Sequence, residues 1–137
     1  MGAIKVFIDT NVLVDFFTER MGDGYAKKVL LAGKTSQYRM CISILTAVNV
    51  IYILKKYDIT LSYRDIESIC SVLGQRTEQW KMARELDEMS DFEDAIQTAC
   101  AIDNKCGFII SRDRHYLNCP LPVLSPEEFV ASVSPQQ

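Results

Sequence analysis

The chain has 137 residues, of which 48% are hydrophobic and 24% charged, and this balance excludes intrinsic disorder, collagen-like repeats and a coiled coil. Its 18 acidic residues outnumber its 15 basic residues, so the formal net charge is −3. An acidic balance argues against a simple electrostatic nucleic-acid binder, because such proteins draw most of their affinity from neutralising phosphates. The length favours a single domain over residues 1–137, with a polar tail from about residue 134.

The five cysteines are odd in number and include no C-x-x-C pair, which argues against both a disulfide framework and a zinc site. No apolar stretch approaches the roughly 20 residues that a membrane-spanning helix needs, and the N-terminal segment does not resemble a signal peptide. We therefore expect a reduced, cytoplasmic protein that does not insert into membranes.

Short apolar strands and amphipathic helices alternate in the first half of the chain. In chain order, the predicted elements are a strand over 4–9, helices over 12–17 and 24–32, a strand over 38–42, and helices over 44–56 and 62–73. Ser43 and Ser62 are natural N-caps for the last two helices, and Gly74 is a stop signal after the second of them.

The second half of the chain continues the same alternation. In chain order, the predicted elements are helices over 78–89 and 90–104, strands over 107–111 and 122–124, and a helix over 126–133. Ser90 and Ser125 each begin a capping box of the form S-x-x-E. Strands that alternate with helices predict an α/β fold, a three-layer α/β/α sandwich around a mostly parallel sheet of four or five strands.

Acidic residues follow two of the predicted strands. Asp9 closes the first strand and Asp113 lies just after the third, and in open parallel sheets ligands bind beyond the carboxyl ends of strands. Asp91 and Asp94 are three residues apart, so both lie on one face of the first turn of their helix. If these acids converge, their repulsion requires raised pKa values or a cation. Carboxylate oxygens favour Mg²⁺ or Mn²⁺ as that cation.

Simpler interpretations apply to several other acids. Asp91 and Glu93 could be structural, because the helix dipole favours negative charge at a helix N-terminus. Asp15 and Glu19 are expected on a solvated helix face. Asp9 resists such an explanation, because a carboxylate at the end of a buried strand must be paired or liganded.

Five motifs in this order resemble a PIN domain, and the resemblance spans essentially the whole chain. The motifs are FIDTNVLVD at 7–15, SILT at 43–46, DFEDA at 91–95, IISRD at 109–113 and PVLSPEEF at 122–129. The resemblance implies a metal-dependent ribonuclease that hydrolyses RNA phosphodiester bonds, often the toxin half of a bacterial toxin–antitoxin pair of the VapC type. It also implies RNA as the substrate, an antitoxin as a candidate partner, and a homodimer.

The resemblance assigns acidic roles to individual residues. Asp9, Asp94 and Asp113 match metal-binding acids of the family, and Asp91 looks like an additional acid on the same turn as Asp94. The second acid of the family is usually a Glu in the helix after the second strand, and here Asn49 is the nearest match. Two explanations compete: Asp91 compensates for the missing charge, or the protein is a weak or specialised nuclease.

The resemblance also implies supporting and substrate-binding residues. Asn11 is similar to the polar residue that orients the first acid, Ser111 stands where the family commonly has a Thr, and Ser43 opens the helix that carries Asn49. Arg112 and Arg114 are candidates to hold the phosphates that flank the cleaved bond.

Three alternatives stay open. A phosphatase of the haloacid dehalogenase class would use Asp9 as its nucleophile, but it requires an acid two residues later, where Asn11 stands. A receiver domain would need an acidic pair near the first strand and a Lys after the last, and neither is evident. A degenerate PIN domain would bind RNA or a partner protein without cleavage.

The acidic surplus is no larger than the candidate site. Without Asp9, Asp91, Asp94 and Asp113, the chain has 14 acids and 15 bases. Bound divalent cations would reverse the sign of the local charge, so we expect RNA binding to depend on metal.

Overall fold

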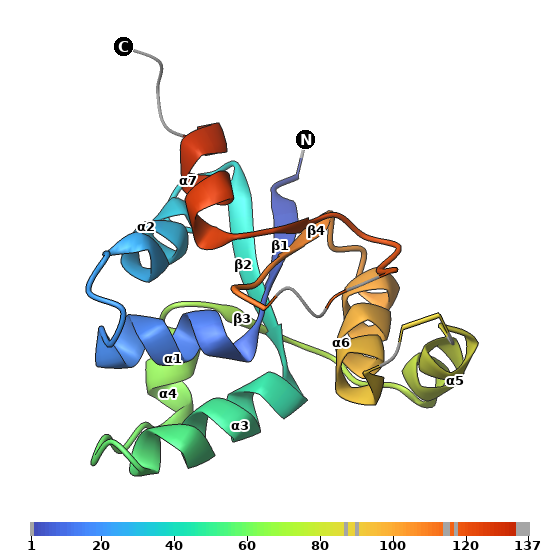
Figure 1. The fold of residues 1–137 in the computed structure, drawn as a ribbon, viewed down its shortest axis with the longest axis horizontal. Helices are drawn as coiled ribbons and strands as arrows, with labels where there is room; N and C mark the ends of the chain where they lie inside the picture. Colours follow the sequence, from blue (N-terminus) through green and yellow to red (C-terminus); the bar gives the residue numbers. More distant parts are fainter. Residues whose placement is uncertain (1, 87, 90, 114–115, 117, 134–137) are drawn as a thin grey trace.

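The computed structural model describes residues 2–86, 88–89, 91–113, 116 and 118–133, and a five-stranded sheet forms its centre (Figure 1). The strands, in the spatial order β3-β2-β1-β4-β5, are β3 Ser71–Leu73, β2 Tyr38–Ser43, β1 Ile4–Ile8, β4 Phe108–Ile110 and β5 Val123–Leu124. All four strand pairs are parallel, so the carboxyl ends of the strands meet at one edge. The expected mostly parallel sheet is parallel throughout the described residues.

Helices cover both faces of this sheet, which confirms the predicted three-layer α/β/α fold (Figure 1). They are α1 Thr10–Thr18, α2 Tyr25–Ala32, α3 Ile44–Lys55, α4 Tyr63–Glu67, α5 Thr77–Glu85, α6 Phe92–Asp103 and α7 Pro126–Val133. Alternate residues of β1 face opposite layers, because strand side chains have a period of two. Val6 and Ile8 pack against α1, α2, α3 and α7, whereas Phe7 packs against α6.

Local capping signals place the starts of several helices where the sequence predicts them. Ser43 Oγ accepts the Thr46 N–H at 2.9 Å and so caps α3. Ser125 and Glu128 form the predicted capping box of α7, with reciprocal hydrogen bonds of 3.1 and 2.8 Å. Because these caps satisfy backbone donors within a few residues, they can be recognised without knowledge of the tertiary fold.

The helix predicted over 62–73 is wrong in its second half. Its capping box at Ser62 is present, but α4 ends at Glu67, and Ser71–Leu73 form the edge strand β3. Ser71 lies opposite Cys41 and Leu73 opposite Ser43, so pairing with β2 fixes this segment in an extended form. That partner strand is about thirty residues away in the chain, and local propensity does not reveal it.

Two helices on the other layer also have different ends from those predicted. Helix α5 ends at Glu85, four residues before the predicted end. Helix α6 begins at Phe92 with Asp91 as its N-cap, one residue later than the S-x-x-E pattern predicts. Ser90, the predicted cap, lies outside the described residues.

All five cysteines are free thiols, as the absence of a paired pattern predicts, and four of them are buried. No helix in the described part of the chain is long and apolar enough to cross a membrane.

Phe129 anchors α7 to the sheet and provides a test of this packing. Its ring is fully buried and packs against Tyr38 and Phe108 at centroid distances of 5.2 and 5.8 Å. Phe129→Ala should lower the free energy of unfolding by about 3–5 kcal/mol, because it leaves a cavity in the core. Urea denaturation measures the change, and Tyr63→Ala, at a side chain that is 77% exposed, should change it by less than about 0.5 kcal/mol. Equal effects of the two substitutions would contradict this role of α7.

Candidate active site

Asp9 lies at the carboxyl edge of the sheet, where β1 passes directly into α1. It is the N-cap of α1, and its Oδ1 accepts the Thr10 N–H at 2.9 Å. Its carboxylate is almost completely buried. The sequence prediction that this acid must be held by specific partners is therefore met in part by the backbone of the helix that follows it.

Ser111 and Asn11 hold the other oxygen of Asp9. Ser111 Oγ donates to Asp9 Oδ2 at 2.6 Å, and the Asn11 amide donates to the same oxygen at 3.3 Å. Ser111 Oγ also accepts the Asp113 N–H at 2.9 Å, and the side-chain Oδ1 of Asn11 accepts the Arg112 N–H at 3.2 Å. These bonds tie the loop after β4 to the first turn of α1, so Asp113 is placed by the same two residues that orient Asp9.

Four carboxylates meet at one hollow of about 210 Å³ beside this edge, from three separate parts of the chain. They are Asp9, Glu93, Asp94 and Asp113. The sequence prediction that Asp9, Asp94 and Asp113 converge agrees with this arrangement. Glu93 is the acid that the sequence prediction left out, since a Glu in the first turn of a helix has a common structural explanation.

Asp91 has a different position from the other predicted acids. Its Oδ1 accepts the Asp94 N–H at 3.0 Å and so caps α6, and it does not line the hollow. Asn49 is half-buried on α3, one turn before Ile53, which does line the hollow. Arg114, predicted to contact phosphate, lies outside the described residues.

The acids around the hollow raise each other's pKa values. Burial, and then the charges of Asp91 and Asp9, raise the pKa of Asp94 to about 7. Burial also raises the pKa of Asp9, against the lowering effect of its hydrogen bonds from Ser111 and Thr10. The pKa of Glu93 is raised by partial burial and by the charges of Asp91 and Asp9. Without a cation, the ionised form of this site is therefore unfavourable.

Asp94 has an additional feature that bears on metal binding. Its Oδ2 is buried and has no hydrogen-bond partner among the described residues. Buried carboxylate oxygens normally have a partner, so this atom lacks the interaction that a hard cation would provide. Among the described residues, no three Asp, Glu, His or Cys side chains are arranged closely enough to form a metal site without movement. The oxygen donors nevertheless fit Mg²⁺ or Mn²⁺ by their chemistry and by this unsatisfied atom.

A buried polar network lies beneath the acids. Gln97 on α6 accepts a hydrogen bond from Ser43 Oγ at 2.6 Å and donates to Thr46 Oγ1 at 2.7 Å. Thr46 Oγ1 in turn lies 3.5 Å from Thr10 Oγ1, next to Asp9. Ser43 thus supports the site as predicted, by joining α3 to α6. Sequence reasoning missed Gln97, for which the available signal was a polar residue in an otherwise apolar helix segment.

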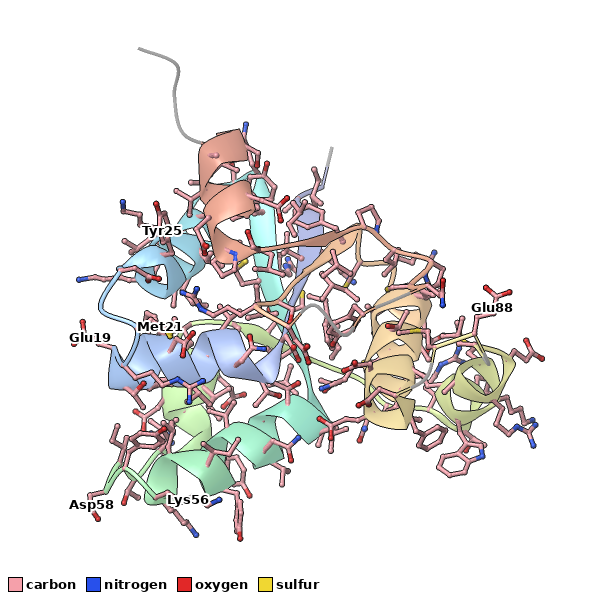
Figure 2. All side chains as sticks on the ribbon, viewed as in Figure 1. Glu19, Met21, Tyr25, Lys56, Asp58 and Glu88 are labelled. Carbon is pink, nitrogen blue, oxygen red and sulfur yellow. The ribbon has the colours of Figure 1, made fainter. Side chains whose placement is uncertain are left out.

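The prediction that Asp15 lies on a solvated face is wrong. Asp15 is 3% exposed, and its two oxygens each accept a hydrogen bond at 2.5 Å, one from Arg20 and one from Arg112. Arg112 comes from the loop after β4, so this ion pair could not be foreseen from the α1 sequence. Glu19 agrees with the prediction, since Figure 2 shows it at the far end of α1, where it is exposed.

Arg112 is more enclosed than a free phosphate-binding residue would be. Besides Asp15, its guanidinium contacts Asp23 and Glu127, each at 3.3 Å. Its side chain is 16% exposed. This arrangement joins the loop after β4 to α1, the loop before α2 and α7, so the described contacts of Arg112 hold the fold around the site.

Tyr116 is a second residue that sequence reasoning missed. Its ring and its hydroxyl are both buried. Burial and the nearby charges of Asp9 and Asp94 raise the pKa of this hydroxyl. Tyr116 is therefore a neutral donor close to two of the acids.

Comparison with known proteins identifies the family. Residues 5–115 match the PIN domain family. The chain belongs to the PIN domain family. It is 33% identical to Ribonuclease VapC1 of Aquifex aeolicus (strain VF5) over 142 aligned positions, which cover 94% of this chain and 95% of the relative.

Solved structures resemble this PIN domain over most of its length. A chain of a toxin–antitoxin complex from Klebsiella pneumoniae has a TM-score of 0.71 and 26% identity, and the match covers 88% of this chain and 97% of that one. VapBC2 from Rickettsia felis, solved with a DNA fragment of its promoter, has a TM-score of 0.67 and 16% identity over 89% and 98% of the two chains. At 16% identity, the similarity to VapBC2 supports the assignment of the fold alone.

The raised pKa of Asp94 predicts a pH dependence of stability in the metal-free PIN domain. Between the ordinary Asp pKa and about 7, the folded protein holds a proton that the unfolded chain releases. The stabilisation is therefore present at low pH and is lost as the pH rises through 7. From pH 5.5 to pH 8, the stability of the wild type relative to Asp94→Asn should fall by about 1–2 kcal/mol.

Urea unfolding in EDTA at several pH values measures this difference. The variant serves as the reference because its amide does not titrate, while Asp9 and Glu93 are present in both proteins. A difference that is the same at pH 5.5 and pH 8 would contradict the raised pKa of Asp94.

Proposed function

We propose that this protein is a divalent-metal-dependent endoribonuclease and the toxin component of a toxin–antitoxin pair, built as one PIN domain over residues 1–137. The observation that carries the proposal is the meeting of Asp9, Glu93, Asp94 and Asp113 at one hollow, with Asp94 Oδ2 buried and unpartnered. Carboxylate oxygens gathered in this way are the ligands that a hard divalent cation prefers.

Asp9, Asp94 and Asp113 are the residues that would hold Mg²⁺ or Mn²⁺. When bound, such an ion lowers the pKa of a water ligand and offsets the negative charge of a phosphodiester. Ser111 and Asn11 keep the Asp9 carboxylate in one orientation through their hydrogen bonds. Outer residues of this kind typically change metal affinity or activity by about 10–100-fold when removed.

Glu93 provides the negative charge that Asn49 lacks. Glu93 lines the hollow, whereas Asn49 does not and lies one turn before Ile53, which does. Asp91 acts on the site through its capping bond to the Asp94 backbone and through its charge. The sequence suggested that Asp91 compensates for the charge missing at Asn49, whereas this assignment gives that role to Glu93.

Three arginine side chains are candidates to bind RNA phosphates at this site. Arg20 lines the hollow, and its side chain is 40% exposed although it also pairs with Asp15. Arg112 and Arg114 keep the roles that the family resemblance implies, contact with the flanking phosphates. Since Arg112 is held by three acids, its larger effect would be on the position of the loop that carries Asp113.

The proposed partners follow from the similar proteins. The Aquifex aeolicus relative is a ribonuclease, and the Klebsiella pneumoniae structure is a toxin–antitoxin complex. We extend both properties to this chain, with an antitoxin protein as the partner and a homodimer as the assembly.

A PIN domain that binds RNA without cleavage is the second candidate, and the neutral Asn49 is the observation that favours it. A phosphatase of the haloacid dehalogenase class is disfavoured, because the residue two positions after Asp9 is an amide that donates to Asp9.

Cleavage of single-stranded and structured RNA in Mn²⁺ tests the proposal. The wild type should cleave at least one of these substrates, EDTA should abolish cleavage, and Asp9→Asn should slow it by at least about 100-fold. Glu93→Gln should also slow it, because the charge that replaces the missing second acid is lost.

Glu19→Gln is the matched control, since this exposed Glu lies at the far end of α1 (Figure 2). It should leave the rate unchanged. Equal rates for wild type and Asp9→Asn would remove the proposed site, whereas RNA binding without cleavage would support the second candidate.

A further inference from the structure

Two exposed aromatic side chains pack against each other at the start of α6. Trp80 and Phe92 are 54% and 52% exposed, and their rings meet edge to face with centroids 5.4 Å apart. Two large apolar rings that contact each other and still face solvent are unusual on a protein surface and often mark a binding site. Their mutual contact keeps both rings in place without a covering element.

This aromatic pair adjoins the acidic hollow. Phe92 is the first residue of α6, next to Asp91, which caps the helix, and Glu93, which lines the hollow. Trp80 comes from α5, which packs along α6 (Figure 1). Phe92 therefore belongs to the same first turn of α6 as Glu93 and Asp94, and its ring faces solvent beside that turn.

Two cations accompany the rings. Lys81 follows Trp80, and Arg84 lies one turn after it on the same helix, and both are exposed. Neither forms an ion pair with a carboxylate among the described residues. Arg76, near the start of the same helix, is by contrast held by Asp103. The surface around Trp80 therefore combines aromatic faces with two exposed cations, which alternate along the segment with the exposed acids Glu78, Glu85 and Glu88.

We propose that Trp80 and Phe92, with Lys81 and Arg84, form a stacking platform for an unpaired base next to the cleaved bond of single-stranded RNA. Bases stack on aromatic side chains whatever their sequence, and nearby cations hold the backbone phosphates. The inference rests on the proposed function, since it places the substrate of that site.

The chemistry of the platform favours RNA over a protein partner. The apolar hollow of about 350 Å³ between α3, α4 and β3 is lined by Ile44, Val48 and Val72 and has no cation in its lining. The platform instead has exposed aromatic rings and, on the same helix as Trp80, the exposed cations Lys81 and Arg84, and this combination matches bases on a charged backbone.

Trp80 is the single tryptophan of the chain, so its fluorescence reports on the platform directly. A single-stranded oligoribonucleotide should quench the Trp80 emission as it binds in Ca²⁺, which avoids a dependence on cleavage. An oligomer of the same length and charge whose sugars lack bases should bind more weakly and leave the emission unchanged.

Variants give the second measurement, with the affinity of a labelled oligoribonucleotide followed by fluorescence anisotropy. Trp80→Ala and Phe92→Ala should each weaken binding about tenfold, whereas Trp80→Phe should retain most of the affinity. Lys81→Ala should weaken binding and make it less dependent on salt. Tyr63→Ala, at a ring on α4 that is 77% exposed, should have no effect, and circular dichroism should show native folding for all five variants.

The outcomes separate this inference from the proposed function. RNA that binds or is cleaved with unchanged Trp80 emission, and with equal affinity for Trp80→Ala, would overturn the platform and leave the nuclease intact. Quenching by an acidic, leucine-rich peptide but not by RNA would assign the rings to a protein partner and also overturn it. No binding of any RNA would overturn both.

Discussion

The repulsion between carboxylates at the carboxyl edge of the sheet is the constraint on which the site depends. Asp9, Glu93, Asp94 and Asp113 come from three segments and meet at one hollow, where burial and mutual charge raise the pKa values of three of them. Their mutual repulsion alone would drive these carboxylates apart, so other contacts of the folded protein must hold them together. A divalent cation relieves the same repulsion, which links the electrostatics of the fold to the proposed chemistry.

Neutral hydrogen bonds and one buried ion pair oppose this repulsion. Ser111 joins Asp9 to the backbone of Asp113, and Gln97 joins the helices that carry the other parts of the site. Asp15 and Arg112 connect the loop after β4 to α1 from the opposite side. Removing one partner of a buried ion pair typically costs about 3–5 kcal/mol, so this contact helps the loop to stay next to the acids.

The sequence predicted the parts of this molecule that depend on short-range chemistry. The serine caps and the strand that ends in Asp9 follow from neighbouring residues, and so did the three-layer fold and the family. Contacts between distant segments were not predictable in the same way. The strand Ser71–Leu73 exists because β2 pairs with it, and Asp15 is buried because Arg112 reaches it across 97 positions. Glu93 was missed because a common structural role explains an acid at its position.

The measurement that tests the link between repulsion and metal most directly is proton release on Mn²⁺ binding, followed by calorimetry in buffers of different ionisation enthalpy. Because the pKa of Asp94 is about 7, Mn²⁺ binding at pH 7 should release about half a proton from this group. Release should be greater at pH 6 and close to zero at pH 8.5, and Asp94→Asn should reduce it at pH 6 and 7. Binding that releases no protons at pH 6 or 7, or no binding of Mn²⁺ at all, would contradict a site in which cation charge replaces a proton on these carboxylates.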